Sequence, residues 1–357
     1  MGNDQRRDGG GTPGHGTMPP VRVTVVVPTY NRAQWLGRAI ESVLAQTYRD
    51  FQLIVSDNCS TDETADVVAR FRDPRLRYVR RQRHLGLNEH YNLCVAEVAS
   101  EYFLIVPDDD ELMPDAIETL VPVLDSRASA GVAHGRARLL RGETIVAAAH
   151  DMTELPGDAL EPGAEFIEKA MAGSHRIHAT TVLYRTEALR PVPLDPRDYP
   201  ATEFGMWLRL ALDWDIAFRA RTIAVYRMHA GSYTSANAAV TGGGYIQTPE
   251  TITNIRDVKL RFLDVHGHRV GNAARLRRAA RRAYARQLVN WAGHATLPER
   301  GLATTAGALA DCVRREPRVL LEAGAWRLLV GSVLGARLAD EVNRRFRGRV
   351  GVREATR

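Results

Sequence analysis

Buried strands alternate with amphipathic helices along the chain from residue 21 to about residue 124. The segment Val23–Val27 is a run of β-branched residues, as expected of a strand that is covered on both faces. In the helix that follows, apolar residues recur with the spacing i, i+4, i+7 and i+8 and mark one buried face: Leu36, Ile40, Val43 and Leu44. Such an alternation with short connections predicts an α/β fold with a mostly parallel, Rossmann-type sheet and flanking helices.

The same patterns predict the remaining elements. Asn31 is expected to cap the first helix, and Ser60 with Glu63 to form a capping box at the second. Further strands are predicted at 51–55, 76–79 and 102–106, with helices ending near 71 and spanning 88–99. Later in the chain we expect strands at 131–140, 144–146, 179–184, 216–218 and 223–226. Helices are expected at 164–172 and 203–212, and loops at 151–163 and 231–244. After the second of these loops, the chain is expected to be helical nearly to its end.

Composition limits the class of protein. Of 357 residues, 45% are hydrophobic and 25% charged, which is typical of a globular protein and excludes wholesale disorder. Three cysteines are too few for a disulfide framework, which favours a reduced, cytoplasmic compartment. Residues 1–20 are expected to be a disordered tail, and no apolar run approaches the ~20 residues that span a bilayer.

Polar residues gather where three of the predicted strands end: Thr29–Asn31, Ser56–Asn58 and Asp108–Glu111. Because the carboxyl ends of parallel strands meet at one edge of a sheet, these residues are expected to share a ligand site. Packed carboxylates repel unless a cation offsets them, and Mg²⁺ or Mn²⁺ prefers such oxygen ligands. A solvated acidic loop is the alternative, but convergence of several strand ends favours a metal–diphosphate site.

Three motifs in this order resemble the inverting glycosyltransferases of family 2, which have the GT-A fold: Val25–Arg32, Ser56–Thr64 and Asp108–Asp110. The resemblance covers about residues 21–235. It implies a nucleotide-sugar donor, a Mn²⁺ or Mg²⁺ cofactor, and transfer of the sugar to an acceptor hydroxyl. A UDP-sugar is favoured, with GDP- and dTDP-sugars as options, and the acceptor is a glycan, a lipid-linked molecule or a small molecule.

The resemblance also implies roles for single residues. The nucleotide-sugar would contact Pro28, Thr29, Tyr30, Arg32, Asp57, Asn88, Asp108, Asp109 and Arg227. Asp57 would hydrogen-bond the base, since a carboxylate accepts the N–H groups of uracil, thymine or guanine. A loop cap is the alternative for Asp57, and a solvated helix position is the alternative for Arg32.

The metal ligands implied are Asp110, Asp109 and His229. The family's acidic motif is Asp-any-Asp-Asp, and Pro107 stands where its first aspartate is usual. Asp109 is therefore assigned to the ribose or the metal and Asp110 to the metal, with Asp108 able to take the missing role. His229 and Arg227 match a family segment that follows the last sheet strand.

Inverting transfer needs a base that takes the acceptor proton. The family's base is an aspartate that opens a helix, and the matching residue here is Glu203, one methylene longer. A glutamate that merely favours the helix dipole is the alternative, and Asp198 is the reserve candidate. His175, Arg176 and His178 are expected to be ordinary loop residues.

Arginines accumulate near the C-terminus with no acidic residue among them: Arg269, Arg275, Arg277, Arg278, Arg281, Arg282 and Arg286. On a helix they would form a cationic face that suits an anionic membrane surface, and a solvated face packed on the catalytic domain is the equal alternative. No folded nucleic-acid motif accompanies them, so no nucleic-acid partner is expected. The expected location is cytoplasmic, at the inner face of the membrane if this helix binds lipid, and an oligomer remains an option.

These observations define the expected organisation. Residues 21–245 are expected to form the GT-A-like domain, with a nucleotide-binding half at 21–125 and an acceptor half at 126–245, followed by a helical extension at 246–357. A sugar nucleotidyltransferase is an alternative, but such enzymes usually open with a Gly-rich basic loop, and here the first strand ends in Pro28–Asn31. A non-catalytic binding protein at a membrane or on nucleic acid is a second alternative.

Overall fold

The computed structural model describes residues 21–142, 144–145, 157–173, 177–229, 231–232, 238–241, 244–295, 302–322 and 325–326. The tail expected at 1–20 lies outside these residues, as do His175 and Arg176.

The first half of the sheet is parallel. It is built from strands β1 (Val23–Thr29), β2 (Phe51–Asp57), β3 (Leu76–Arg80) and β4 (Tyr102–Ile105), in the order β3-β2-β1-β4. Helices α1 (Ala33–Leu44), α2 (Thr64–Ala69) and α3 (Leu87–Ala96) connect them. The carboxyl ends of β1, β2 and β4 therefore meet at one edge, as the sequence predicts.

The second half of the sheet is mixed. After β4 the order continues β9-β6-β10-β5, with β9 antiparallel to both of its neighbours and β10 parallel to β6. The strands are β5 (Glu111–Leu112), β6 (Ala130–Arg141), β9 (Val182–Arg185) and β10 (Asp215–Met228), and the short strands β7 (Thr144–Ile145) and β8 (Ala159–Glu161) pair with β6 and β10. The pairing of β5 with β10 brings the chain after β10 beside the acidic segment.

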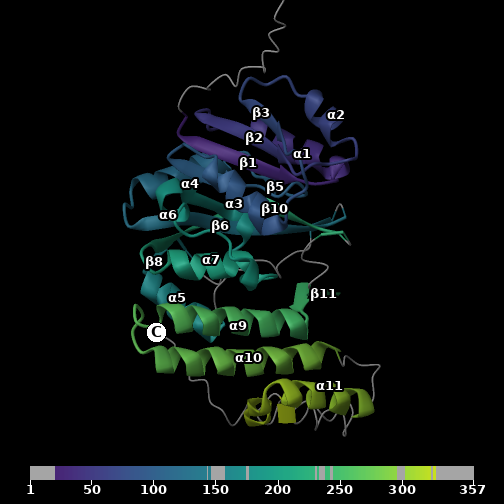
Figure 1. Cartoon of the computed structure of the whole chain (residues 1–357), viewed down its shortest axis with the longest axis vertical. Helices are drawn as coiled ribbons and strands as arrows, with labels where there is room; N and C mark the ends of the chain where they lie inside the picture. The colour runs from purple at the N-terminus through teal and green to yellow at the C-terminus, as the bar shows by residue number, and fades with distance from the viewer. Residues whose placement is uncertain are drawn as a thin grey trace, which may run out of the picture.

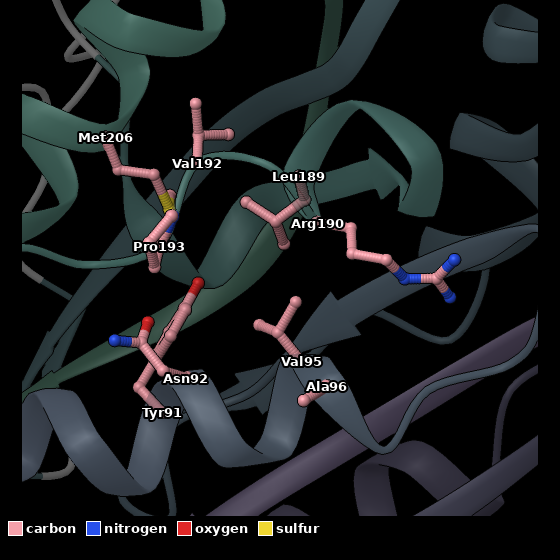
Figure 2. A pocket seen from close by; sticks show the side chains of 9 residues that line it. All are labelled: Tyr91, Asn92, Val95, Ala96, Leu189, Arg190, Val192, Pro193 and Met206. Carbon is pink, nitrogen blue, oxygen red and sulfur yellow. The ribbon is translucent and has the colours of Figure 1, made fainter.

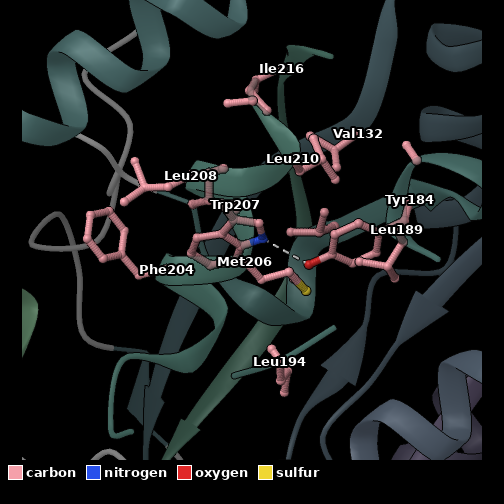
Figure 3. Packing of buried hydrophobic residues seen from close by; sticks show 14 of the residues in the cluster. Val132, Tyr184, Leu189, Leu194, Phe204, Met206, Trp207, Leu208, Leu210 and Ile216 are labelled. Carbon is pink, nitrogen blue, oxygen red and sulfur yellow. Dashed lines mark hydrogen bonds between the residues drawn. The ribbon is translucent and has the colours of Figure 1, made fainter. Parts of the chain in front are cut away.

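Helices cover both faces of the sheet. One apolar cluster joins the sheet to α1 and α4 (Ala116–Asp125), and the other joins it to α3, α5 (Gly163–Ala172), α7 (Thr202–Leu210) and α9 (Pro249–His266). Figure 3 shows the second cluster around Trp207, whose indole donates to the Tyr184 hydroxyl at 3.0 Å. This contact fixes α7 against β9, and Glu203 lies in the first turn of that helix.

The C-terminal helices stack in layers below the sheet (Figure 1). Helix α10 (Ala273–Ala295) packs on α9 and α5 on one side and on α11 (Leu302–Arg315) on the other. The helical stretch expected from the end of the 231–244 loop begins only at Pro249, because residues 244–247 form the strand β12 (Gly244–Gln247). From Pro249 the described residues are mostly helical and include the 3₁₀ turn Pro317–Leu321. None of the helices in the described residues has the length and hydrophobicity of a membrane-spanning segment.

Several boundaries differ from the prediction. The two strands expected at 216–218 and 223–226 form one continuous strand, β10, which bulges between Phe218 and Ala224. The loop expected at 231–244 contains a strand, β11 (Ala238–Thr241), which pairs with β12 (Gly244–Gln247). The strand expected at 179–184 begins as the 3₁₀ turn Ala179–Thr181, and α6 (Thr186–Leu189) follows β9.

Both predicted helix caps are wrong. Asn31 adopts a left-handed backbone (φ 52°), and its side chain accepts from the Thr61 amide at 2.7 Å instead of capping α1. The Ser60 hydroxyl accepts from the Asn31 amide at 2.9 Å, so it does not cap α2. Asp62 satisfies the amides at both helix starts, Ala33 at 2.9 Å and Thr64 at 3.2 Å. Long-range pairing of the two loops overrides the local capping pattern.

Candidate active site

The acidic segment after β4 is buried. Asp110 is 1% exposed, and its two carboxylate oxygens accept from the Arg227 amide at 2.9 Å and from the Thr180 hydroxyl. Burial and the neighbouring Asp109 carboxylate raise the pKa of Asp110 well above its ordinary value. Asp110 therefore joins the acidic segment to the end of β10 and to the turn before β9.

Asp109 lies between two nitrogen groups. Its Oδ2 atom is 2.5 Å from Nη1 of Arg32 and 3.0 Å from Nε2 of His229. The same Arg32 nitrogen is 3.4 Å from Oδ1 of Asp108, whose pKa burial raises to about 7 although Arg32 acts to lower it. The other guanidinium nitrogen donates to the Gly231 carbonyl at 2.9 Å. Side chains from two distant segments, Arg32 before α1 and His229 after β10, thus converge on the Asp109 carboxylate.

Trp35 contacts one residue near the end of β10, Arg227, and one residue just after it, His229. The Arg227 guanidinium lies 5.1 Å from the Trp35 ring centroid, and the rings of Trp35 and His229 are 5.0 Å apart. Arg227 is also paired with Glu111 and is buried. Sequence reasoning missed Trp35 and Thr180, because no local pattern links either residue to partners that lie 70 or more positions away.

The second strand end holds Asp57 in a closed network. Its Oδ1 accepts from the Ser60 amide at 2.8 Å, and its Oδ2 accepts from the Tyr78 hydroxyl at 2.5 Å and lies 3.6 Å from Arg80. Asp57 is buried, and Cys59 turns the chain beside it with φ 70°. The arrangement is consistent with the loop-cap alternative and leaves the base-binding role of Asp57 a prediction.

The other predicted donor contacts lie along the same edge. Pro28 and Thr29 end β1, and Tyr30 is 42% exposed with its ring 4.2 Å from the ring of His84. Asn88 is in the first turn of α3, and its buried Oδ1 has no hydrogen-bond partner in the described part of the chain. An exposed aromatic pair and an unsatisfied amide oxygen are features that a bound nucleotide would use.

Glu203 differs from Asp108 and Asp109 because no arginine of the described residues forms an ion pair with it. Its carboxylate is 3.2 Å from the Thr202 hydroxyl, and burial raises its pKa. The reserve candidate Asp198 is buried and accepts from Arg209 at 2.8 Å and from Arg261 at 3.1 Å. Asp198 thus joins α7 to α9, and the assignment of Glu203 as the base stays a prediction.

A small cavity of about 70 Å³ lies between α3 and the segment that leads from α6 toward α7 (Figure 2). Tyr91, Val95 and Met206 are among its lining residues. Asn92, on the same wall, exchanges two hydrogen bonds with the backbone of Leu194, at 3.0 Å and 2.8 Å. Asn92 is therefore structural, and the cavity is too small for a nucleotide.

The residues present fit a divalent metal only in part. A carboxylate oxygen and an imidazole nitrogen 3.0 Å apart, from Asp109 and His229, are ligand types that Mn²⁺ accepts. Asp110 directs both of its oxygens to protein donors, so the three predicted ligands do not form one cluster. Among the described residues no group of three or more His, Cys, Asp or Glu side chains is arranged to hold a metal ion.

His178, which was expected to be an ordinary loop residue, has an unusual environment. His178 packs edge-on against Tyr226 at 4.4 Å, two residues before Thr180. Burial lowers its pKa to about 4, and its buried Nδ1 has no hydrogen-bond partner among the described residues. A neutral imidazole therefore lies near the residue that binds Asp110.

Comparison with known proteins finds a family match over part of the chain. A model described as Glycosyl transferase family 2 matches residues 24–190. GalNAc(5)-diNAcBac-PP-undecaprenol beta-1,3-glucosyltransferase of Campylobacter jejuni is 32% identical over 152 residues, which are 42% of this chain and 46% of that protein. The chain therefore spans less than half the length of this curated relative.

Two solved structures are similar to the chain, and the first of them supports the fold. S. aureus TarS in complex with UDP-GlcNAc is similar with a TM-score of 0.53 and 15% identity, over 87% of this chain and 91% of that one. The mannosyltransferase PcManGT from Pyrobaculum calidifontis, in complex with GDP-Man and Mn²⁺, has a TM-score of 0.49 and 17% identity over 88% of each chain. The TarS likeness shows the fold alone. The match over residues 24–190 identifies this part of the chain as a glycosyltransferase family 2 domain, and its sheet has the GT-A arrangement.

Proposed function

We propose that the protein is a metal-dependent inverting glycosyltransferase that moves a sugar from a nucleotide-sugar to an acceptor hydroxyl. The observation that carries the proposal is the convergence of Asp109, His229 and Arg32 at the carboxyl edge of a family 2 domain. A hydroxyl of the acceptor would attack the anomeric carbon, and the nucleoside diphosphate would leave from the opposite face.

Different residues of the chain would bind the metal, neutralise the diphosphate and accept the proton. Asp109 and His229 would hold Mn²⁺ or Mg²⁺, which when bound offsets the negative charge of the diphosphate. Arg227, buried over Trp35, adds a fixed positive charge at the same place. Glu203 would take the proton from the acceptor hydroxyl, and its raised pKa makes it a stronger base than an exposed glutamate.

The proposed donor is a UDP-sugar and the proposed acceptor is lipid-linked. The Campylobacter relative is a GalNAc(5)-diNAcBac-PP-undecaprenol beta-1,3-glucosyltransferase, whose name contains a lipid, undecaprenol. A lipid-linked acceptor would place the enzyme at a membrane surface. Arg278, Arg281 and Arg282 are exposed on α10 and would provide the contact with anionic lipid.

The proposal is tested by incubating the protein with UDP-, GDP- and dTDP-sugars in turn, with and without Mn²⁺, and following release of the nucleoside diphosphate. We expect slow hydrolysis of one donor class only when Mn²⁺ is present, because water can replace the acceptor. Asp109→Asn should lose this activity, whereas Asp213→Asn, which changes an exposed carboxylate paired with Arg269, should keep it. If no sugar nucleotide is bound or hydrolysed, the proposal fails and a non-catalytic binding protein is favoured.

A further inference from the structure

Arg32 links three parts of the candidate site that are far apart in sequence. It lies between β1 and α1, and its guanidinium contacts Asp108 and Asp109 after β4 and the Gly231 carbonyl after β10. Its side chain is 27% exposed, so the charge is reachable from solvent. No other described arginine contacts both of these aspartates.

The atom that Arg32 binds is the one that a metal would use. Oδ2 of Asp109 accepts from Nη1 of Arg32 at 2.5 Å and is also the oxygen 3.0 Å from Nε2 of His229. A cation held jointly by Asp109 and His229 must lie against this oxygen. The Arg32 guanidinium and the metal are therefore competitors for one carboxylate oxygen, and like charges in such proximity repel.

Arg227, the second arginine near the site, cannot play this part. Its side chain is 4% exposed and is held by an ion pair with Glu111 and by the Trp35 ring. It remains in place whatever occupies the site, whereas Arg32 can turn toward solvent and toward a ligand there. A guanidinium has five donors in a planar fork, which suit a phosphate group as well as they suit a carboxylate.

We propose that Arg32 is a movable counter-charge that couples metal binding to donor binding. Without a metal, Arg32 neutralises the charges of Asp108 and Asp109. When a metal binds, Arg32 must leave Oδ2 of Asp109. Its guanidinium then pairs with the diphosphate of the donor. Metal alone binds weakly because it must displace Arg32. Metal together with the diphosphate binds strongly because Arg32 has a new partner. This inference rests on the proposed function and adds a coupling role for Arg32 within it.

The test is a titration with Mn²⁺, in which free Mn²⁺ is measured by electron paramagnetic resonance, with and without UDP. The proteins are the wild type, Arg32→Met, Arg32→Lys and the control Arg219→Met, which removes an exposed arginine paired with Asp158. Without UDP we expect Arg32→Met to bind Mn²⁺ on the order of tenfold more tightly, because a nearby positive charge is gone. The Mn²⁺ affinity of Arg32→Lys should lie between those of the wild type and Arg32→Met. The Mn²⁺ affinity of Arg219→Met should match that of the wild type.

Adding UDP separates the coupling role from a merely structural one. Coupling is reciprocal, so UDP should tighten Mn²⁺ binding, and Mn²⁺ should tighten UDP binding, by the same factor. We expect that factor to be several-fold smaller in Arg32→Met than in the wild type. A structural role alone would weaken Mn²⁺ binding in the variant and leave the factor unchanged.

The proposal is overturned if Arg32→Met binds Mn²⁺ without UDP no more tightly than the wild type does, or if the coupling factor is the same in both. It is also overturned if neither protein binds Mn²⁺. The hydrolysis assay with sugar nucleotides is independent of these titrations. A protein that hydrolyses a donor but shows no Arg32 effect would keep the proposed function and lose only this inference.

Discussion

Glu203 is the residue on which the proposed chemistry depends most. Burial raises its pKa, and its carboxylate contacts Thr202 at 3.2 Å. The aspartate that the resemblance implies at this position is one methylene shorter, so the proposed role requires the start of α7 to hold the longer side chain at the same point. The sequence motif predicts that Glu203 opens this helix, and the structure confirms its place in the first turn.

We expect the transfer rate to depend on pH through Glu203. A base works when it is deprotonated, so the rate should rise with pH through the pKa of Glu203, which lies above the ordinary 4.5. Glu203→Gln should lower transfer by about 10²–10⁴-fold and leave UDP binding unchanged, since general-base catalysis contributes that much. The measurement is the initial transfer rate from pH 4 to pH 9, taken as roughly the range over which a carboxyl with a raised pKa titrates.

The matched control for this prediction is Glu187→Gln, which changes an exposed glutamate on α6. It should retain both the rate and its pH profile. Transfer by Glu203→Gln within a few-fold of the wild type would exclude Glu203 as the base.

Single residues were predictable where an ordered motif includes them and not where a contact spans the chain. Asp109 and His229 were both expected among the metal ligands, and the structure brings their side chains to 3.0 Å of each other. Trp35 lies on the side of α1 and carries no motif signal, although it packs against both Arg227 and His229. The metal assignments themselves stay predictions.

Helix α7 is held by a buried carboxylate beneath it. Asp198 pairs with Arg209 on α7 and Arg261 on α9, so one acidic side chain joins two helices. Gly205 faces this carboxylate closely enough that a Cβ atom there would overlap Asp198 Oδ2. The first turn of α7 is therefore positioned by the absence of a side chain at Gly205.

We expect Gly205→Ala to lower the free energy of unfolding by about 1–3 kcal/mol, the usual cost of forcing an extra methyl group into a packed site. The matched control is Gly271→Ala, because a Cβ at Gly271 would meet no atom within 4 Å. Denaturant unfolding of both variants checks this expectation. Equal stabilities for the two variants would show that α7 is not fixed through Gly205.

Secondary-structure elements were predicted well where periodicity decides them and poorly where pairing does. The parallel strands β1 to β4 follow from their apolar runs. The polar stretch Arg219–Arg221 reads as a turn, yet β10 continues through it because β6 and β8 flank the strand and a bulge absorbs the polar residues. The caps at Asn31 and Ser60 failed because each side chain pairs with the other loop.

At the scale of the whole molecule, the alternation of strands and helices predicts the fold class. It does not predict how α9, α10 and α11 stack on one another in Figure 1. The sequence predicts helices in this region but carries no signal for their order in space. Part of the arginine cluster is used within the fold: Arg275 pairs with Glu168, and Arg277 pairs with Asp264. The division at residues 245 and 246 stays a prediction.

The remaining arginines of α10 allow a test of membrane contact. Arg278, Arg281 and Arg282 are exposed, and replacing all three by Gln should weaken binding to vesicles that contain anionic lipid, because each basic residue near such a surface contributes about 1 kcal/mol. Sedimentation with anionic and with neutral vesicles is the measurement. Equal binding of the wild type and the triple variant to anionic vesicles would favour the solvated-face alternative.

The central claim is that a metal bridges the acidic segment to a diphosphate whose base lies beside Asp57. The most direct measurement is a crystal structure of the protein with Mn²⁺ and a non-hydrolysable UDP-sugar. The account predicts Mn²⁺ bound to Asp109 and His229, diphosphate oxygens on the metal, and Arg32 turned away from Asp109. A nucleotide bound elsewhere, or an Asp109–Arg32 pair left intact beneath a bound donor, would contradict it.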